Sequence, residues 1–198
     1  MPISIEDFPD VERVDYDTVR EDIRSGDILL CEGDAVFSKL IKLGTGSIWT
    51  HVAFIIRLDS IDRVMVMESV ESMGVRTVPL RHYVENYKGE GKGYNGRLLI
   101  ARHSDFDDKV NIKNLSKFAV DRFGYPYDND EIVKIAGRIL GVFRKKSKDD
   151  NEYICSEYAQ ECYESIGIIF DYDDRKFIAP ADFAKEEKVE AIVELEVT

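Results

Sequence analysis

The sequence predicts an α+β protein in which an antiparallel sheet packs against helices. The run V-A-F-I-I-R-L after His51 is apolar on both faces, a polar turn at 59–62 follows, and V-M-V-M-E-S then predicts a second buried strand. The second half of the chain shows helical spacing instead, ending in a helix that begins near Cys155. With 198 residues, 44% of them hydrophobic, we expect an N-terminal arm and helix at 1–24 and one domain at 25–198.

The remaining elements follow from the same patterns. Apolar runs bounded by glycine, proline or polar turns predict short strands at 27–31, 74–79, 97–102 and 189–197. Helical spacing predicts helices at 14–24, 35–43, 80–87, 112–119 and 132–143, and a helix that starts at Pro180. The first ten residues, which carry two prolines, predict an extended arm. The G-T-G-S run at 44–47 lacks the lysine of a phosphate-binding loop, so we interpret it as a turn before His51.

Cys155 opens the most informative helix. Cys155, Ala159, Cys162 and Ile166 have the i, i+4, i+7, i+11 spacing of a stripe that faces a core. At a helix start, unpaired N–H groups and the positive end of the helix dipole stabilise a thiolate over a thiol. This is the environment of a nucleophile, although a free cysteine is also commonly a small buried hydrophobic residue.

A histidine and a glutamate share the predicted hairpin. If its turn is centred between Asp59 and Ser60, facing residues have numbers that sum to 119, which pairs His51 with Glu68. Facing residues of antiparallel strands have Cβ atoms about 4.5–5.5 Å apart, so the carboxylate can hold an imidazole N–H. A lone histidine at a strand start is usually structural or exposed, but burying this pair in an apolar hairpin is costly unless the two groups bind each other.

Charge and composition argue against several classes of function. A formal charge of −12 and a pI near 4.8 disfavour a nucleic-acid partner, which needs a basic surface. The three cysteines have no metal-ligand spacing and form no even-numbered disulfide framework, which favours a reducing compartment. The N-terminus lacks the pattern of a signal peptide, and no apolar run approaches the roughly 20 residues of a transmembrane helix. We therefore expect a cytoplasmic chain without a membrane span.

Three separated pieces of the sequence together resemble a known family. These are G-D-I-L-L from residue 26, W-T-H-V-A from residue 49 with Glu68 and Gly74-Val75 after it, and G-Y-P-Y-D from residue 124 with Y-I-C-S-E from residue 153. Over about residues 25 to 185 they resemble the circularly permuted branch of the NlpC/P60 superfamily. This papain-like group includes the YiiX-like proteins and, more distantly, the lecithin:retinol acyltransferases. The resemblance implies a permuted papain-like domain in which an antiparallel sheet or small barrel packs against the cysteine helix.

The resemblance also implies the roles of individual residues. Cys155 matches the nucleophile, His51 the general base and Glu68 the residue that orients the imidazole. Tyr127 matches the tyrosine that lines the oxyanion site, with Tyr125 and Tyr153 as nearby rivals. The implied activity is a cysteine hydrolase, of the peptidase or amidase kind, that cleaves an amide or ester through an acyl-enzyme and needs no metal or organic cofactor.

The substrate class stays open at this point. A small peptide, an N-acyl amino acid and a lipid-like ester all suit the family. The I-C-S-E context of Cys155 departs from the N-C-E-H-type motif of the acyltransferases, which argues against specific lipid acyl transfer. The alternatives are an acyltransferase on the same scaffold, a catalytically idle lipid- or peptide-binding module, and a structural domain in which His51 and Glu68 form a buried pair.

Overall fold

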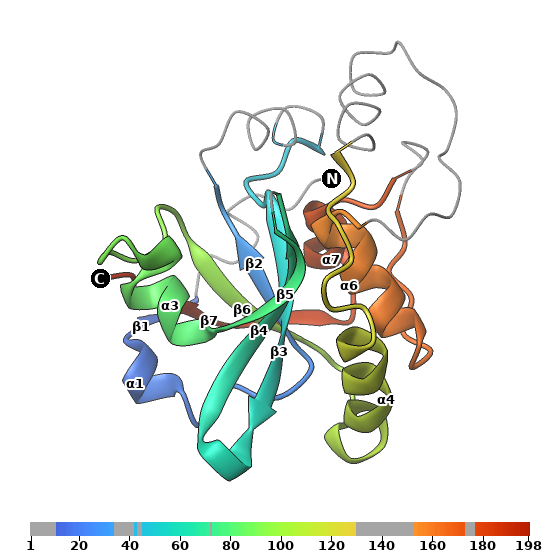
Figure 1. The fold of residues 1–198 in the computed structure, drawn as a ribbon, viewed down its shortest axis with the longest axis horizontal. Coiled ribbons are helices and arrows are strands. Elements are labelled where there is room, and N and C mark those ends of the chain that lie inside the picture. Colours follow the sequence, from blue (N-terminus) through green and yellow to red (C-terminus); the bar gives the residue numbers. More distant parts are fainter. Residues whose placement is uncertain (1–10, 34–41, 43–44, 72, 130–152, 173–176) are drawn as a thin grey trace.

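A seven-stranded sheet forms the centre of the computed structural model, which describes residues 11–33, 42, 45–71, 73–129, 153–172 and 177–198 (Figure 1). The strands are β1 (Arg13–Val14), β2 (Asp27–Cys31), β3 (His51–Leu58), β4 (Arg63–Val70), β5 (Gly74–Pro79), β6 (Leu98–His103) and β7 (Val189–Leu195). Their order is β1-β7-β6-β2-β3-β4-β5, and all neighbours are antiparallel except β1 and β7.

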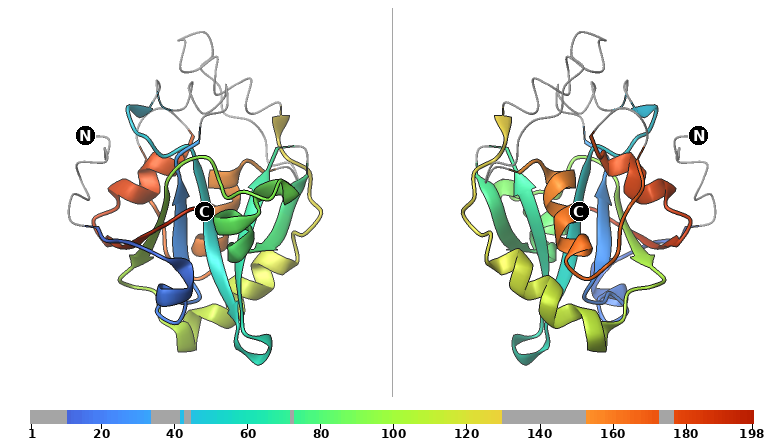
Figure 2. Two further views of the ribbon diagram at one scale, coloured as in Figure 1. Left: turned by 90° about the vertical axis from the view of Figure 1, so that its left-hand side faces the viewer. Right: turned by 90° about the vertical axis from the view of Figure 1, so that its right-hand side faces the viewer.

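The helices lie on both faces of this sheet (Figure 2). They are α1 (Tyr16–Val19), α3 (Leu80–Glu85), α4 (Asp108–Val120), α6 (Cys155–Glu164) and α7 (Pro180–Lys185), with short 3-10 turns at Asp59–Ile61 and Tyr87–Gly89. The mixed α+β class predicted from the sequence is confirmed. None of the described helices is long and apolar enough to cross a membrane.

The central strands are apolar on both faces because each face is covered. Along β3, Val52, Phe54 and Ile56 belong to one buried cluster, whereas Ala53 and Ile55 belong to a second cluster on the opposite face. Successive side chains of a strand point to opposite faces, so a strand buried on both sides has a continuous apolar sequence. This explains the unbroken V-A-F-I-I run after His51.

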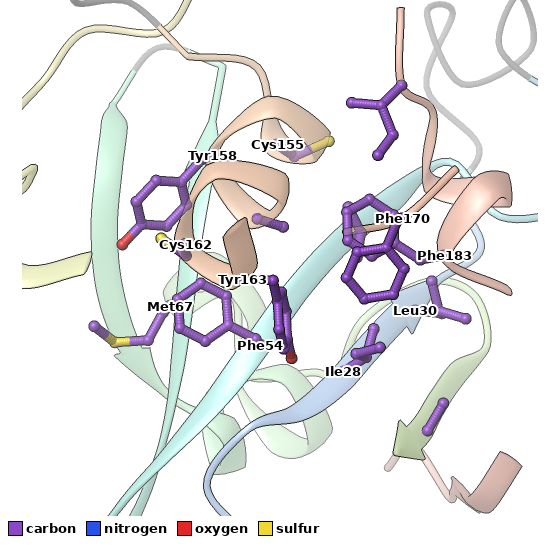
Figure 3. Close-up of a cluster of buried hydrophobic side chains, with 14 of the residues drawn as sticks. Ile28, Leu30, Phe54, Met67, Cys155, Tyr158, Cys162, Tyr163, Phe170 and Phe183 are labelled. Atoms are coloured by element: carbon purple, nitrogen blue, oxygen red, sulfur yellow. The ribbon is translucent and has the colours of Figure 1, made fainter. Parts of the chain in front are cut away.

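The first cluster joins the sheet to α4, α6 and α7. Its centre is the ring of Phe54, whose centroid lies 5.8 Å from those of both Tyr158 and Tyr163 on α6. Figure 3 shows these rings packed between α6 and the strands, with Cys155 at the start of the helix (Figure 3). The predicted apolar stripe is confirmed for Cys155, Ala159 and Cys162, which are buried in the cluster, whereas Ile166 lies beyond the end of the helix and is partly buried.

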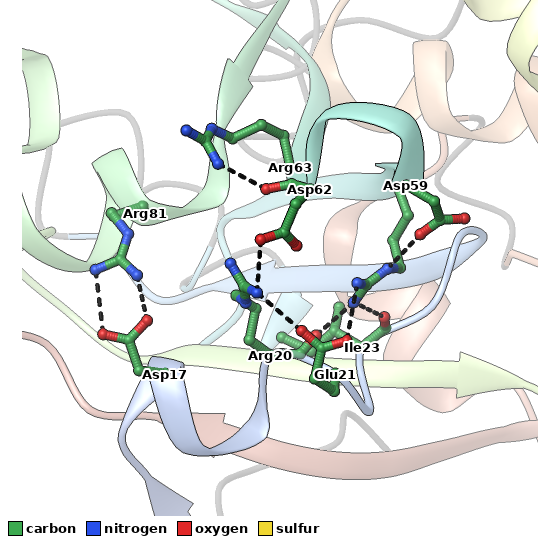
Figure 4. A network of polar contacts seen from close by, with 9 residues as sticks. Asp17, Arg20, Glu21, Ile23, Asp59, Asp62, Arg63 and Arg81 are labelled. Carbon is green, nitrogen blue, oxygen red and sulfur yellow. Dashed lines mark hydrogen bonds and ion pairs between the residues drawn. The ribbon is translucent and has the colours of Figure 1, made fainter.

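The second cluster lies under α1 and α3. Ile23, Val66 and Tyr83 belong to it. Around its rim, charged groups tie α1 and the chain after it to the rest of the protein (Figure 4): Arg20 Nη2 lies 2.9 Å from Asp62 Oδ2, and Arg81 of α3 pairs with Asp17. Exposed ion pairs of this kind contribute little to stability individually.

Two predictions about the sheet are corrected. The sheet is open, with β1 and β5 at its edges, and does not close into a small barrel. The β3–β4 hairpin has facing residues whose numbers sum to 121, as in Phe54 with Met67, instead of 119. The cause is a longer turn, in which a 3-10 turn at Asp59–Ile61 is followed by Asp62 in the left-handed region at φ 51°. Because the shift is two residues, His51 and Glu68 stay on the same face and become diagonal neighbours.

The N-terminal region also differs from the prediction. Instead of a helix at 14–24, Arg13 and Val14 form a strand parallel to β7, and the helix covers only Tyr16–Val19. The Asp15 carboxylate, which accepts hydrogen bonds from the backbone N–H groups of Asp17 and Thr18, starts the helix after the strand. The expected arm at 1–10 and the helix expected at 132–143 lie outside the described residues, as does the helix expected at 35–43 except for residue 42.

The packing around Phe54 generates a stability prediction. Replacing Phe54 by Ala is expected to lower the free energy of unfolding by about 3–5 kcal/mol, because a fully buried ring between two tyrosines leaves a cavity. Urea unfolding followed by circular dichroism measures the change. Ile61→Ala is the control, since this side chain is 60% exposed and should change stability by less than about 0.5 kcal/mol. A loss below about 1 kcal/mol for Phe54→Ala would contradict the packing described here.

Candidate active site

His51 is the first residue of β3, at the end of the strand nearest the start of α6. The chain before it is pinned by the backbone N–H of Thr50, which donates to the Cys31 carbonyl at 3.0 Å, and by the Thr50 Oγ1 atom, which accepts from the Gly33 N–H at 2.8 Å. The imidazole is mostly buried, with 17% of the side chain exposed. Its position at the strand end lets one ring contact groups from both faces of the sheet.

Glu68 lies beside His51 on the neighbouring strand β4. Its Oε2 atom is 2.9 Å from His51 Nε2, and the carboxylate is fully buried, with 0% of the side chain exposed. The structure therefore brings together the pair that the hairpin pattern suggested, although through the diagonal register and not through directly facing positions. Nε2 of the imidazole is occupied by the carboxylate, which leaves Nδ1 for a second partner.

Cys155 is the first residue of α6 and is 6% exposed. Side chains and backbone fix the chain on both sides of it: the Ser69 hydroxyl on β4 donates to the Tyr153 carbonyl at 2.7 Å, and the Tyr153 N–H donates to the Pro126 carbonyl at 3.1 Å. The Ser156 hydroxyl donates to the Ile178 carbonyl at 2.7 Å. These bonds hold the first turn of α6 against β4 and against the chain that leads into α7.

The three groups influence one another electrostatically. Burial alone would lower the pKa of His51, but its charge interaction and hydrogen bond with Cys155, together with those with Glu68, raise that pKa to about 10. Burial would raise the pKa of Glu68, and His51, Arg76 and Tyr83 hold it below its usual value. Glu68 and the Cys155 sulfur therefore both favour the protonated form of the His51 ring.

Tyr127 lies on the G-Y-P-Y-D segment close to Cys155. Its ring packs against Ile154, the residue before the cysteine, and against Phe177 and Ala179. Burial, and then the proximity of Cys155, raise the pKa of Tyr127, so its hydroxyl remains a donor at neutral pH. The rival Tyr153 is engaged elsewhere, since its hydroxyl donates to Glu161 Oε2 at 2.7 Å.

Tyr125, the second rival, stacks on the Tyr153 ring with a centroid separation of 6.1 Å. Its backbone carbonyl accepts from the Val75 N–H at 2.9 Å, which attaches the G-Y-P-Y-D segment to β5. The attachment leaves no room for a side chain at Gly74, where an added Cβ would lie 2.0 Å from this carbonyl oxygen, and Gly74 also has a positive φ of 70°. The conformation of this glycine therefore contributes to placing Tyr127.

Two residues of the site were missed by the sequence reading. Arg76 directly faces Glu68 across the β4–β5 ladder, and its Nε atom donates to Glu68 Oε1 at 2.8 Å. The Tyr83 hydroxyl on α3 donates a hydrogen bond to Glu68 Oε2. The register of the second hairpin, which turns between Val70 and Gly74, could have revealed Arg76. Tyr83 has no sequence signal of this kind, because α3 meets β4 only in the tertiary structure.

Other candidate ligands do not gather at this site. His103, at the end of β6, is buried against Phe170, and its Nδ1 atom accepts from the Asp105 N–H at 3.2 Å. Among the residues that the structure describes, no group of three or more His, Cys, Asp or Glu side chains is arranged to hold a metal ion.

Comparison with known proteins places the chain in a family. The family model of permuted papain-like amidase enzymes, the YaeF/YiiX or C92 family, matches residues 22–197. The chain belongs to this family. As a C92 family member it is a papain-like cysteine peptidase or amidase with a permuted order of elements, which confirms the family and the class of enzyme predicted from the sequence.

A solved structure supports the fold. The crystal structure of the metalloprotein yiiX from Escherichia coli O157:H7 matches this C92 chain with a TM-score of 0.66, at 17% sequence identity, over 89% of this chain and 99% of that chain. At this identity the likeness concerns the fold alone. No curated protein sequence matches the chain significantly.

The electrostatics of the site generate a measurable prediction. In the native C92 protein, the His51 ring is expected to titrate near pH 10, because Cys155 and Glu68 stabilise its protonated form. Replacing Cys155 by Ala should move this midpoint down by at least one pH unit, toward the usual value near 6.5. Proton NMR of the three histidine rings measures both values, with His103 as the internal control. A His51 midpoint below 7 in the native protein would contradict the electrostatic arrangement.

Proposed function

We propose that the protein is a cysteine hydrolase that cleaves an amide or ester bond through a Cys155–His51–Glu68 triad. The observation that carries this proposal is that one imidazole contacts a buried carboxylate through Nε2 and interacts with a cysteine at a helix start. A nucleophile, a base within reach and a third group that orients the base are the signature of covalent catalysis.

Each group has a defined step in this mechanism. The Cys155 thiolate attacks the carbonyl carbon, and the His51 imidazolium gives its proton to the departing amine or alkoxide as the thioester forms. His51 then takes a proton from water, the hydroxide attacks the thioester, and the acid product leaves with the thiolate restored. Glu68 keeps the imidazole in one orientation and stabilises its protonated form throughout.

The oxyanion of the tetrahedral intermediate requires donors that are already in place. The backbone N–H of Cys155 is one of the first N–H groups of α6 and has no partner within the helix. The hydroxyl of Tyr127 is the second donor that we propose, supported by its position near Ile154 and its electrostatic coupling to Cys155. Two donors from different elements would stabilise the oxygen without reorganisation.

The substrates that we propose are small acyl compounds, namely a short peptide, an N-acyl amino acid or a lipid-like ester. The chemistry of the triad acts on any of these carbonyl groups, and the acidic chain, with a formal charge of −12, disfavours a polyanionic substrate. Hydrolysis is preferred over acyl transfer, because the I-C-S-E context of Cys155 differs from the acyltransferase motif.

Alkylation of Cys155 tests the proposal without knowledge of the substrate. Iodoacetamide is expected to modify Cys155 rapidly already near pH 6, and the rate should fall at least tenfold in His51→Ala, which lacks the cation beside the sulfur. Peptide mass spectrometry from pH 4 to 9 measures the rate, with the buried Cys31 and Cys162 as internal controls. A rate that rises only near pH 8.5 and does not change in His51→Ala would overturn the proposal and leave a binding or structural domain.

Replacing Tyr127 by Phe tests the proposed oxyanion donor. Loss of one such donor typically lowers the rate by about 10²–10³, so acylation of Cys155 by p-nitrophenyl acetate should slow by this factor. Release of nitrophenolate and the mass of the acetylated protein measure acylation. Tyr125→Phe is the matched control and should keep the native rate, since its ring stacks on Tyr153. An equal loss of acylation rate in both variants would show that Tyr127 is not the oxyanion donor.

A further inference from the structure

Glu68 binds more groups than a triad requires. Its Oε2 atom accepts hydrogen bonds from His51 Nε2 and from the Tyr83 hydroxyl, and its Oε1 atom accepts from Arg76 Nε at 2.8 Å. The three donors come from three different elements, β3, α3 and β5. A fully buried carboxylate without such partners would be strongly destabilising or would become protonated.

We propose that Arg76 and Tyr83 are positioning residues of the active site, which keep Glu68 ionised and aimed at His51. The proposal rests on the function proposed above and extends the site to the face of the sheet opposite α6. In the described part of the chain, neither side chain donates a hydrogen bond to His51 or Cys155, so both act through the carboxylate.

The Tyr83 side chain is held rigidly in its position. It is buried in the second cluster, and the centroid of its ring lies 5.0 Å from the Tyr87 ring centroid and 5.6 Å from the Tyr94 ring centroid. Burial raises the pKa of Tyr83 well above its usual value, and the charge of Glu68 raises it further, so the hydroxyl keeps its proton and remains a donor. A rigid aromatic cluster thus delivers one hydrogen bond to the carboxylate oxygen that His51 uses.

Arg76 contacts the Glu68 carboxylate with a positive charge, whereas Tyr83 contacts it with a neutral hydroxyl. Its Cα directly faces that of Glu68 across the ladder, and its Nη1 atom also lies 3.0 Å from Met73 Sδ. The ion pair is partly protected from water, because the Glu68 carboxylate is fully buried while 22% of the Arg76 side chain is exposed. With Arg76 on Oε1 and His51 on Oε2, each carboxylate oxygen has a cation, which fixes the carboxylate orientation.

Two further titratable groups in the described part of the chain are influenced by Glu68. Besides His51, Arg76 and Tyr83, these are Cys31 of β2 and Tyr87 in the turn after α3, both of which are influenced by the Glu68 charge. Burial raises the pKa of Cys31 well above its usual value, and the pKa of Tyr87 is raised to about 12. Both remain neutral in acid, so neither adds a charge beside Glu68 in that range.

The sign of the effect follows from the lowered pKa of Glu68. His51, Arg76 and Tyr83 all favour the ionised carboxylate, so removal of Arg76 or Tyr83 raises the pH at which Glu68 takes up a proton. A protonated Glu68 no longer holds the imidazolium in one orientation, so the cation is no longer fixed beside the Cys155 sulfur. The acid limb of Cys155 reactivity therefore moves to higher pH.

The test measures the acid-side midpoint of Cys155 alkylation by iodoacetamide in the full chain. We expect an upward shift of about one pH unit in Arg76→Gln and a smaller upward shift in Tyr83→Phe, which loses a neutral donor. Arg76→Lys, which keeps the charge, should recover at least half of the Arg76→Gln shift. Because Tyr83→Phe is conservative, it carries the test if Arg76→Gln does not fold.

Matched controls separate positioning from general destabilisation. Arg81→Gln removes an arginine from an ion pair with Asp17, and Tyr163→Phe removes a buried hydroxyl that donates to the Gly26 carbonyl at 2.9 Å. Neither control should move the midpoint, whatever its melting temperature. Native-like midpoints in folded Arg76→Gln and Tyr83→Phe would overturn this inference alone. Absence of fast alkylation in the native protein would instead overturn the proposed triad.

Discussion

The rest of the site depends on one buried negative charge, the carboxylate of Glu68. A carboxylate without exposure to water is tolerated only where donors surround it, and here β3, β5 and α3 each supply one. This requirement links the hairpin, the third strand and the helix after it into one unit. The same charge raises the proton affinity of His51, so the cost of burying Glu68 is coupled to the chemistry that we propose.

The sheet connects two cores at this point. Cys155 and α6 belong to the core on one face, whereas Tyr83 belongs to the core on the other. His51 is the first residue of β3, at the end of the strand, where a side chain can reach groups on both faces of the sheet. A ring in this position can interact with a thiol from one layer and a carboxylate supported by the other. Rigid elements on both sides hold such a geometry more closely than loops would.

The permuted order of the chain leaves this geometry intact. The histidine strand comes about a hundred residues before the cysteine helix, so no short motif contains both groups. What unites them is the packing of α6 on β3 and β4, reinforced by the Ser69 bond to the Tyr153 carbonyl and the Ser156 bond to the Ile178 carbonyl. Catalytic arrangements are recognised by geometry and roles, and the order of residues along the chain is secondary.

Local pattern determined most of the secondary structure. The strands at 27–31 and 74–79 and the start of the helix at Cys155 lie where apolar runs, turn residues and helical spacing predict them. These features depend on neighbours in sequence, which is why the chain alone reveals them. The sequence also shows Cys155 at a helix start and His51 with Glu68 on one hairpin, and the family resemblance joins the three as a candidate triad.

Long-range contacts decided the remaining features. The N-terminal strand depends on pairing with β7, at the other end of the chain. The Tyr83 bond to Glu68 requires α3 to pack on β4. None of these contacts leaves a local periodic signal, because each is a hydrogen bond or a packing contact between segments that only folding brings together.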